Sequence, residues 1–373
     1  MKYLFLFGMY RSGTTTLSKA IDCIDNVIMK NDPLFFLFKS LRNSILPKKK
    51  LSSNELFGSY IFNKNEKKIF KKIQELNLKK KFFYRKKIIK NILINIKKYQ
   101  PDLEDKILNN SGKTYSDFIK IFFKDIAKGK KDIKYCGIKE VWLTEFYPSL
   151  KKEYKNSKFI FLIRDPRAVV ASSLSNRKNS YNIQFLVNQW RKISILSKIY
   201  KEKNNKDIIL INYENFVLNF DKEIEKICNF LNLKKTSTNR IIYRLTKEKK
   251  WKQNSTYAKK KSLTSSKIVN KYFDKSSINM WKKKLTSKQI KFIEFILYEE
   301  MKIFNYKPRY IKNINLNQEY KNEKNLEFLD EFIDQKEKKN ELHRKKIIYK
   351  QNKFKDLFFF KNSELKIYKN SII

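Results

Sequence analysis

A segment near the N-terminus has the residues of a phosphate-binding loop. It reads Gly8-Met9-Tyr10-Arg11-Ser12-Gly13-Thr14-Thr15, which fits the G-x-x-x-x-G frame of a P-loop. In such a loop, backbone N–H groups and a helix N-terminus form a concave anion site. A nucleoside triphosphatase has Lys where this chain has Thr14, so Arg11 is the one cation of the loop. The segment therefore predicts an anion held at the loop mouth, and a plain glycine turn is the alternative.

A second polar cluster follows the most clearly apolar run of the chain, residues 158–163. Arg164-Asp165-Pro166-Arg167 comes next, and Ser172 lies eight residues after Arg164. Ligands of open α/β sheets bind outside the carboxyl ends of the strands, and a guanidinium with a hydroxyl suits a phosphate. We therefore predict that Arg164 and Ser172 hold one phosphate. An ion pair between Arg164 and Asp165 is the alternative.

The scarce residue types exclude several kinds of catalysis. The single histidine, His343, lies near the C-terminus, so a Ser-His-Asp triad or a multi-histidine metal site would depend on that one residue. The three cysteines, Cys23, Cys136 and Cys228, are far apart, and we expect neither a disulfide framework nor a metal cluster. A general base must then be a carboxylate, Lys, Tyr or Cys.

The chain of 373 residues is strongly basic, with 85 Lys and Arg against 37 Asp and Glu and a formal net charge of +48. Such a charge suits an anionic partner. The lysines are spread over the whole chain, beside many Asn and Ile, as AT-rich coding would produce. We therefore interpret the charge mainly as compositional drift, and nucleic acid is not the expected partner.

The apolar runs are too short for a membrane span, which needs roughly 20 residues. The first run, residues 3–7, is also too short for a secretory signal, and no small-residue cleavage site follows it. We expect a cytoplasmic protein. An apolar patch at residues 357–360, flanked by lysines, predicts packing against the core or peripheral contact with an anionic membrane surface, and we favour packing.

Alternating strands and helices must position the polar clusters. Apolar runs predict strands over residues 3–7, 26–29, 133–138, 158–163 and 207–212. Helices are expected from Thr14, from Pro166 and over residues 142–154, 185–200, 220–231 and 278–304. This order predicts an α/β protein with a P-loop NTPase-like three-layer fold, in which helices flank a central, mainly parallel sheet.

We expect one domain over residues 1–310. It contains a mostly helical insertion at about residues 34–130, which is Lys-rich and has apolar residues at helical spacing. Residues 311–373 are rich in Lys and Asn and are interpreted as a largely helical C-terminal extension.

Several segments, in this order, resemble the sulfotransferase family that uses 3′-phosphoadenosine 5′-phosphosulfate (PAPS). After the loop comes Cys136-Gly137-Ile138-Lys139, which is similar to the family's G-x-K segment. The most specific piece is Phe161-Leu162-Ile163-Arg164-Asp165-Pro166-Arg167-Ala168-Val169-Val170-Ala171-Ser172. Residues 211–216, 227–233, 254–255 and 281–306 are similar to later family segments. The resemblance covers residues 1–308 and is nearest to the prokaryotic, carbohydrate and tyrosylprotein branches.

The resemblance implies how the donor would be held. Its 5′-phosphosulfate would lie on Arg11, Ser12, Gly13, Thr14 and Thr15. Its 3′-phosphate would lie on Arg164 and Ser172, with Tyr213 near the nucleotide. Lys139 would lie near the transferring sulfuryl group, and a plain surface lysine is the alternative.

The resemblance also implies a general base. The tyrosylprotein branch keeps a glutamate at the end of the strand after the first helix, and that place here holds Asp32. Asp32 is shorter by one methylene, so the acceptor would have to come closer to reach hydrogen-bond distance. Asp32 is either this base or a turn residue before Pro33, and Glu140 is the reserve candidate. The expected catalytic residues are thus Arg11, Asp32 and Lys139.

The implied reaction is in-line transfer of the sulfuryl group of PAPS to an acceptor hydroxyl, with a carboxylate base and no metal. The basic, aromatic-rich insertion suits a glycan, a lipid-linked sugar or an anionic polymer as acceptor. Two other functions stay open. One is a P-loop kinase or other phosphotransferase, and the other is a degenerate sulfotransferase core that binds anionic polymers without catalysis.

Overall fold

The computed structural model describes residues 1–45, 71–81, 85–141, 143–175, 181–204, 206–245, 275–311, 326–335, 338–339, 341–342 and 345. These residues form two compact units. The first unit contains the described residues of 1–45, 72–164 and 196–278, and the second contains residue 71 and the described residues of 165–195 and from 279 onward.

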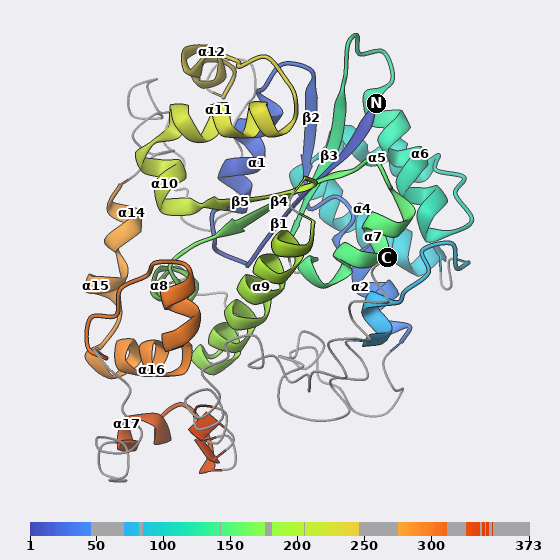
Figure 1. The fold of residues 1–373 in the computed structure, drawn as a ribbon. Helices are drawn as coiled ribbons and strands as arrows, with labels where there is room; N and C mark the ends of the chain where they lie inside the picture. Colours follow the sequence, from blue (N-terminus) through green and yellow to red (C-terminus); the bar gives the residue numbers. More distant parts are fainter. Residues whose placement is uncertain are drawn as a thin grey trace. The chain divides into compact units, whose positions relative to one another are not determined.

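A five-stranded parallel sheet forms the centre of the first unit (Figure 1). The strands lie in the order β2-β3-β1-β4-β5. Their bounds are β1 Lys2–Gly8, β2 Val27–Asn31, β3 Tyr135–Val141, β4 Lys158–Ile163 and β5 Ile208–Asn212. Because the strands are parallel, their carboxyl ends meet at one edge of the sheet. The residues that follow β1, β2, β4 and β5 are therefore brought to the same edge.

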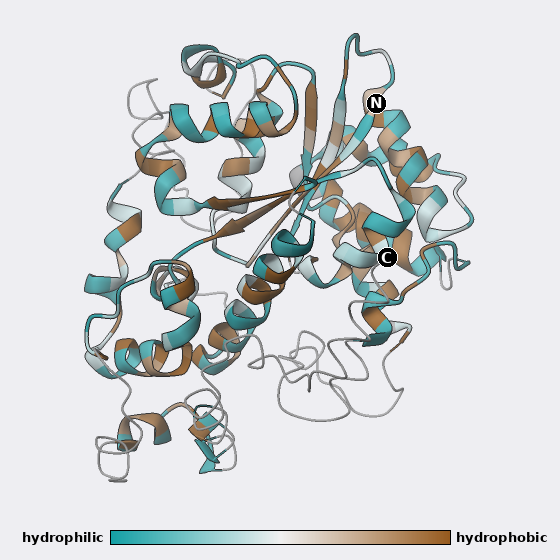
Figure 2. Ribbon diagram, viewed as in Figure 1, coloured by the Kyte–Doolittle hydropathy of each residue, from teal (hydrophilic) through white to brown (hydrophobic). Residues whose placement is uncertain are grey.

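Side chains of the strands alternate between two apolar layers, one on each face of the sheet. On one face, Leu4 and Leu6 pack with α1 (Thr14–Asp22), α10 (Tyr213–Leu218), α11 (Phe220–Phe230) and α12 (Thr238–Tyr243). The opposite face is aromatic and contains Phe5, Phe7, Phe123, Tyr147, Phe159 and Phe161. Figure 2 shows hydrophobic strands beside helices that mix hydrophobic and hydrophilic residues. Burial on both faces explains why the strand sequences are continuous apolar runs.

Helices fill the described part of the chain between β2 and β3. Their bounds are α2 Phe35–Asn43, α4 Arg85–Tyr99, η2 Pro101–Leu103, α5 Glu104–Leu108 and α6 Tyr115–Ala127. Helix α4 packs against α2 and buries Ile88, Ile92 and Ile96, which lie at the four-residue spacing of one helix face. After β3 come η3 (Thr144–Phe146) and α7 (Tyr147–Glu153).

The second unit is built from helices over its described residues. They are α8 Pro166–Leu174, the part of α9 (Ile183–Lys203) before Leu196, α15 Trp281–Lys284, α16 Ser287–Ile303 and α17 Glu327–Asp330. Helix α8 packs against α15 and α16. Buried Arg191 pairs with Glu300 at 3.1 Å and with Glu341 at 2.9 Å. This pairing ties Glu341, within the predicted C-terminal extension, to the second unit.

The predicted strands and helices are confirmed, with shifts at their ends. The third strand begins at Tyr135 and runs to Val141, beyond the predicted 133–138. The predicted helical pair at 278–304 is divided into α14 (Ser276–Asn279), α15 and α16, because Thr286 caps α16 in a capping box with Gln289. Residues 254–255 and 357–360 lie outside the described residues. Among the described helices, none is long and apolar enough to cross a membrane.

Candidate active site

The predicted phosphate loop connects β1 to α1 through two residues with left-handed backbone. Arg11 has φ 67° and Gly13 has φ 90°. A Cβ atom at residue 13 would lie 2.3 Å from the ring of Tyr213, so a side chain is excluded there. Helix α1 then begins with no side-chain cap and no acidic residue in its first turn. Its first backbone N–H groups and its positive dipole end therefore suit an anion.

The hydroxyl of Ser12 supports the same interpretation. Ser12 is buried, and its Oγ has no hydrogen-bond partner among the described residues. Leaving a buried hydroxyl unsatisfied costs roughly 1–3 kcal/mol. An anion on the loop would accept that hydrogen bond, so Ser12 fits a phosphate- or sulfate-bearing ligand.

Arg164, directly after β4, lies beside this loop. Its Nη1 donates to the Arg11 carbonyl oxygen at 3.0 Å, and its Nη2 donates to the Ser277 carbonyl oxygen at 2.7 Å. The guanidinium lies 4.2 Å from the centre of the Tyr213 ring, and the Tyr213 hydroxyl is 3.1 Å from Ser277 Oγ. The structure thus brings three predicted residues together. Ser277 was missed because nothing in its sequence neighbourhood marks it.

Ser172 lies on α8, within the second unit, and is buried. Arg164 belongs to the first unit. The shared grip of Arg164 and Ser172 on one phosphate therefore stays a prediction. Asp165, which sequence analysis offered as an ion-pair partner of Arg164, pairs with Arg167 at 2.6 Å.

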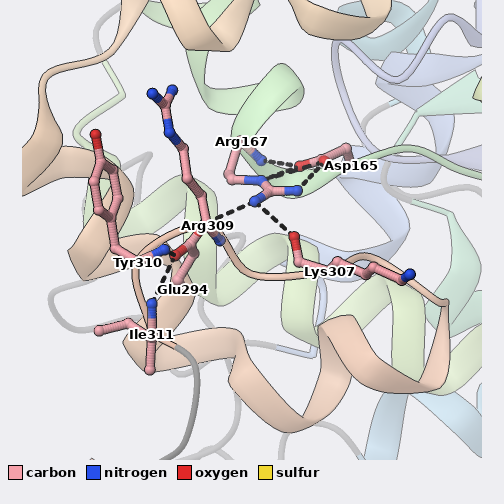
Figure 3. A network of polar contacts seen from close by, with 7 residues as sticks. All are labelled: Asp165, Arg167, Glu294, Lys307, Arg309, Tyr310 and Ile311. Atoms are coloured by element: carbon pink, nitrogen blue, oxygen red, sulfur yellow. Dashed lines mark hydrogen bonds and ion pairs between the residues drawn. The ribbon is translucent and has the colours of Figure 1, made fainter.

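Arg167 belongs to a buried network within the second unit (Figure 3). Its guanidinium binds Asp165 and Glu294 and lies 3.9 Å from the centre of the Trp281 ring. Glu294 also accepts hydrogen bonds from the backbone N–H groups of Arg309, Tyr310 and Ile311 at 2.7–3.2 Å. In Figure 3 the side chains of Arg309 and Tyr310 point away from this network. Through Glu294, Arg167 therefore helps to hold the chain after α16 in place, and its role in the second unit is structural.

Asp32 and Lys139 meet at the carboxyl end of β2. Lys139 lies on the neighbouring strand β3, and its ammonium group binds Asp32 Oδ2. The other carboxylate oxygen, Oδ1, accepts from the Val141 N–H at 3.2 Å. Lys139 is buried, whereas the side chain of Asp32 is 22% exposed. The two predicted catalytic residues thus form a pair in which the carboxylate is the accessible member.

Glu140, the reserve base, is fully buried beside this pair. Its Oε1 accepts from the Leu34 N–H at 2.6 Å. Burial raises the pKa of Glu140 well above its ordinary value, the Asp32 carboxylate raises it further, and the Leu34 hydrogen bond and Lys139 lower it. Glu140 therefore has no exposed surface with which to reach an acceptor, and Asp32 is the better placed carboxylate.

Lys19 adds a cation that sequence analysis missed. Its pKa is lowered from 10.5 to about 8, chiefly by burial; the charge of Asp22 acts against this shift, and the charge of Lys139 contributes to it. Lys19 lies four residues after Thr15 on α1, which places both residues on one face of the helix. That spacing from the loop was a usable signal.

The donor set therefore fits an anionic nucleotide. The loop supplies N–H groups and the Ser12 hydroxyl, Arg164 supplies a guanidinium, and the Tyr213 ring stands against both. Among the described residues, no group of three or more His, Cys, Asp or Glu side chains could hold a metal ion. The arrangement can bind phosphate or sulfate groups and place an amine and a carboxylate at the same sheet edge.

Known proteins have sequences similar to this chain. The chain is 31% identical to two nematode proteins, from Caenorhabditis briggsae and Caenorhabditis elegans, each named "Putative protein-tyrosine sulfotransferase". The matches run over 138 and 139 residues, cover 34% of this chain, and cover 48% and 52% of the two relatives. The chain thus spans about half the length of the curated relatives it matches.

The chain is also similar to solved structures, and one family model matches it. The chain is similar to the sulfotransferase domain from the curacin biosynthetic pathway, at 15% identity and TM-score 0.44, over 77% of this chain and 92% of that one. It is similar to the sulfotransferase domain of the Synechococcus PCC 7002 olefin synthase at the same identity and TM-score, over 77% and 89%. The model of the sulfotransferase family matches residues 4–237, more than half of the sequence. The chain therefore belongs to the sulfotransferase family.

Proposed function

We propose that this protein transfers a sulfuryl group from PAPS to an acceptor hydroxyl. The observation that carries the proposal is the meeting of Arg164, Tyr213 and the loop at residues 8–15, with the Asp32–Lys139 pair at the carboxyl edge of the same sheet. Each group has a place in such a reaction, and the loop lacks the lysine that a triphosphate site needs.

Donor binding follows from the cations, hydroxyls and backbone N–H groups of the site. Arg11, Ser12, Gly13, Thr14 and Thr15 would hold the 5′-phosphosulfate at the start of α1. Arg164, together with Ser172, would hold the 3′-phosphate, and Tyr213 would flank the nucleotide. The donor itself supplies an activated sulfuryl group on a phosphate leaving group.

The transfer step needs charge stabilisation and a base. Lys139 and Arg11 would neutralise charge that grows on the oxygens of the leaving group and the sulfuryl group. Asp32 would take the proton of the acceptor hydroxyl. For this, its Oδ2 must release the Lys139 ammonium group and accept a hydrogen bond from the acceptor hydroxyl instead. Burial of Lys139 strengthens its field at the reacting atoms, because water screens it less there.

The acceptor class is also a proposal. Helix α4 exposes Lys86, Lys87, Lys90 and Lys97. It packs against α2 and reaches the turn at Asp32 through a hydrogen bond from Asn95. A basic helix beside the base suits an anionic acceptor, such as an acidic glycan or an anionic polymer.

Calorimetric titration with adenosine 3′,5′-bisphosphate, beside AMP and ATP–Mg, tests the donor class. We expect tight binding of the bisphosphate alone. Arg164→Ala should weaken that binding roughly 10- to 100-fold, as loss of charge-assisted hydrogen bonds does. Arg240→Ala, at a 57% exposed arginine of the same unit, is the matched control and should bind like the natural protein.

Other outcomes select other functions. Tighter binding of ATP–Mg would favour a phosphotransferase. Binding of anionic polymers that collapses with salt, without preference for the bisphosphate, would favour a degenerate core. Activity is then measured as transfer of ³⁵S from PAPS to a panel of glycans, phenols and lipid-linked sugars, where Lys139→Met should reduce the rate roughly 10²- to 10³-fold.

A further inference from the structure

Side chains occupy the open side of the edge strand β2: the Asp22 carboxylate accepts from the Met29 N–H at 2.8 Å, and the Gln100 amide binds Asn31. β2 lies at the end of the strand order, so only its β3 side is paired within the sheet. Gln100 fills the other side at the last residue of the strand. Its Oε1 accepts from the Asn31 N–H at 3.1 Å, and its Nε2 donates to the Asn31 carbonyl oxygen at 2.5 Å. The amide of Gln100 thus makes both hydrogen bonds that a neighbouring strand would make.

The next residue, Asp32, is held in the same way. The Asn95 Nδ2 donates to the Asp32 carbonyl oxygen at 3.1 Å, and the Asp32 N–H donates to the Lys139 carbonyl oxygen at 2.7 Å. Asp32 has φ 49°, a left-handed conformation that is uncommon for a residue with a side chain. Such a conformation persists where surrounding contacts impose it. Asn95 lies on α4 and Gln100 directly follows that helix.

We propose that Asn95 and Gln100 are positioning residues, which set the backbone of Asp32 so that its short carboxylate meets Lys139 and the acceptor. The proposal rests on the proposed function of Asp32 as base. Under this proposal the helical insertion has a function besides contact with the acceptor, because α4 determines the position of the base. Among the described hydrogen bonds, both side-chain amides bind only backbone atoms of residues 31 and 32.

The reactivity of the Asp32 carboxylate tests this directly. The full-length protein is treated with a water-soluble carbodiimide and glycine ethyl ester, and labelling is followed by peptide mass spectrometry. Asn95→Ala, which loses one hydrogen bond, should raise the labelling rate of Asp32 about fivefold, and Gln100→Ala, which loses two, should raise it at least as much. The rate at Asp117, an exposed residue on α6, is the internal reference and should not change.

Two further variants separate positioning from general loosening. Asn95→His keeps a ring N–H donor at a similar reach and should restore the natural labelling rate. Ile94→Ala, at the 62% exposed neighbour of Asn95 on the same helix, is the matched control and should label like the natural protein. In PAPS turnover, Gln100→Ala should lower kcat about tenfold and leave the KM for PAPS unchanged.

Each outcome decides the proposal. Equal labelling of Asp32 in the natural protein, Gln100→Ala and Asn95→Ala would overturn it, as would an equal rise in Ile94→Ala. Binding of adenosine 3′,5′-bisphosphate is measured for every variant. If the natural protein does not bind the bisphosphate, the proposed function is overturned. The labelling result would still decide whether α4 holds the backbone of Asp32.

Discussion

Helices α1 and α8 each follow a buried strand in the sequence, yet their N-terminal ends differ in chemistry. The start of α1 has no side-chain cap, has Gly13 in a left-handed conformation, and leaves the Ser12 hydroxyl without a described partner. The start of α8 is capped by Asp165, which accepts from the Arg167 N–H at 2.8 Å. The start of α1 therefore suits a ligand, whereas at the start of α8 a side chain of the protein already accepts a hydrogen bond from the backbone.

The difference shows what charged residues after a strand can mean. At α8, the Arg167 charge is met by Asp165 and Glu294 and covered by Trp281. At the start of α1, the first backbone N–H groups have no side-chain cap, and the buried Ser12 hydroxyl has no described partner. Polar groups that satisfy one another stabilise the fold. Backbone and hydroxyl donors at an uncapped helix N-terminus favour an anion from outside.

The largest expected effect is at the satisfied end. Glu294→Ala removes a buried carboxylate that accepts from Arg167 and from three backbone N–H groups. It should lower the free energy of unfolding by about 3–5 kcal/mol, because it leaves a buried guanidinium partly compensated. Denaturant unfolding measures this, with Glu299→Ala on the same helix, at a 17% exposed side chain, as control. A loss below about 1 kcal/mol would contradict the structural role of this network.

A smaller effect is expected at the open end. Gly13→Ala forces a Cβ into the Tyr213 ring and strains a residue with φ 90°. We expect a loss of about 1–3 kcal/mol in stability and at least tenfold weaker binding of the bisphosphate, because the loop must move. Gly129→Ala is the matched control, since Gly129 also has positive φ (75°) but has no atom within 4 Å of its Cβ position. Equal effects of the two variants would show that strain alone, and not the Tyr213 contact, governs the loop.

The smallest effect concerns Lys19. Because its pKa in the folded protein is about 8, below its ordinary value of 10.5, the unfolded chain binds its proton more tightly. Stability of the natural protein should therefore rise as pH increases from about 8 towards 10.5. Lys19→Met removes the buried charge, so its Tm should exceed that of the natural protein at pH 7, and the gain should vanish by pH 10.5. A gain that is independent of pH would point to packing instead.

Much of the fold was predictable because the signals are local. Continuous apolar runs such as residues 158–163 belong to strands buried on both faces, and β4 has those bounds. Gly8 and Gly13 mark the turn, and helical spacing after Thr14 marks α1. The shifts at β3 and around Thr286 arise because strand ends and helix breaks depend on pairing and capping, which a hydrophobic pattern does not encode.

The candidate site was predictable residue by residue, but not in its partnerships. Asp32, Lys139, Arg164 and the loop were all identified from their places after strands or within motifs. The sequence did not predict that Asp32 pairs with Lys139, 107 positions away. It also did not predict that the Tyr213 ring lies against Gly13.

The sequence by itself determined the alternation of strand, loop and helix, and the residue types that gather at the carboxyl edge of the sheet. Only the tertiary structure decided which polar residues satisfy each other, as Arg167 and Glu294 do, and which helix ends lack a side-chain cap, as at the start of α1. The physical reason is that apolar periodicity reports burial within one element. A polar group's role depends on the distant groups that share its desolvated surroundings.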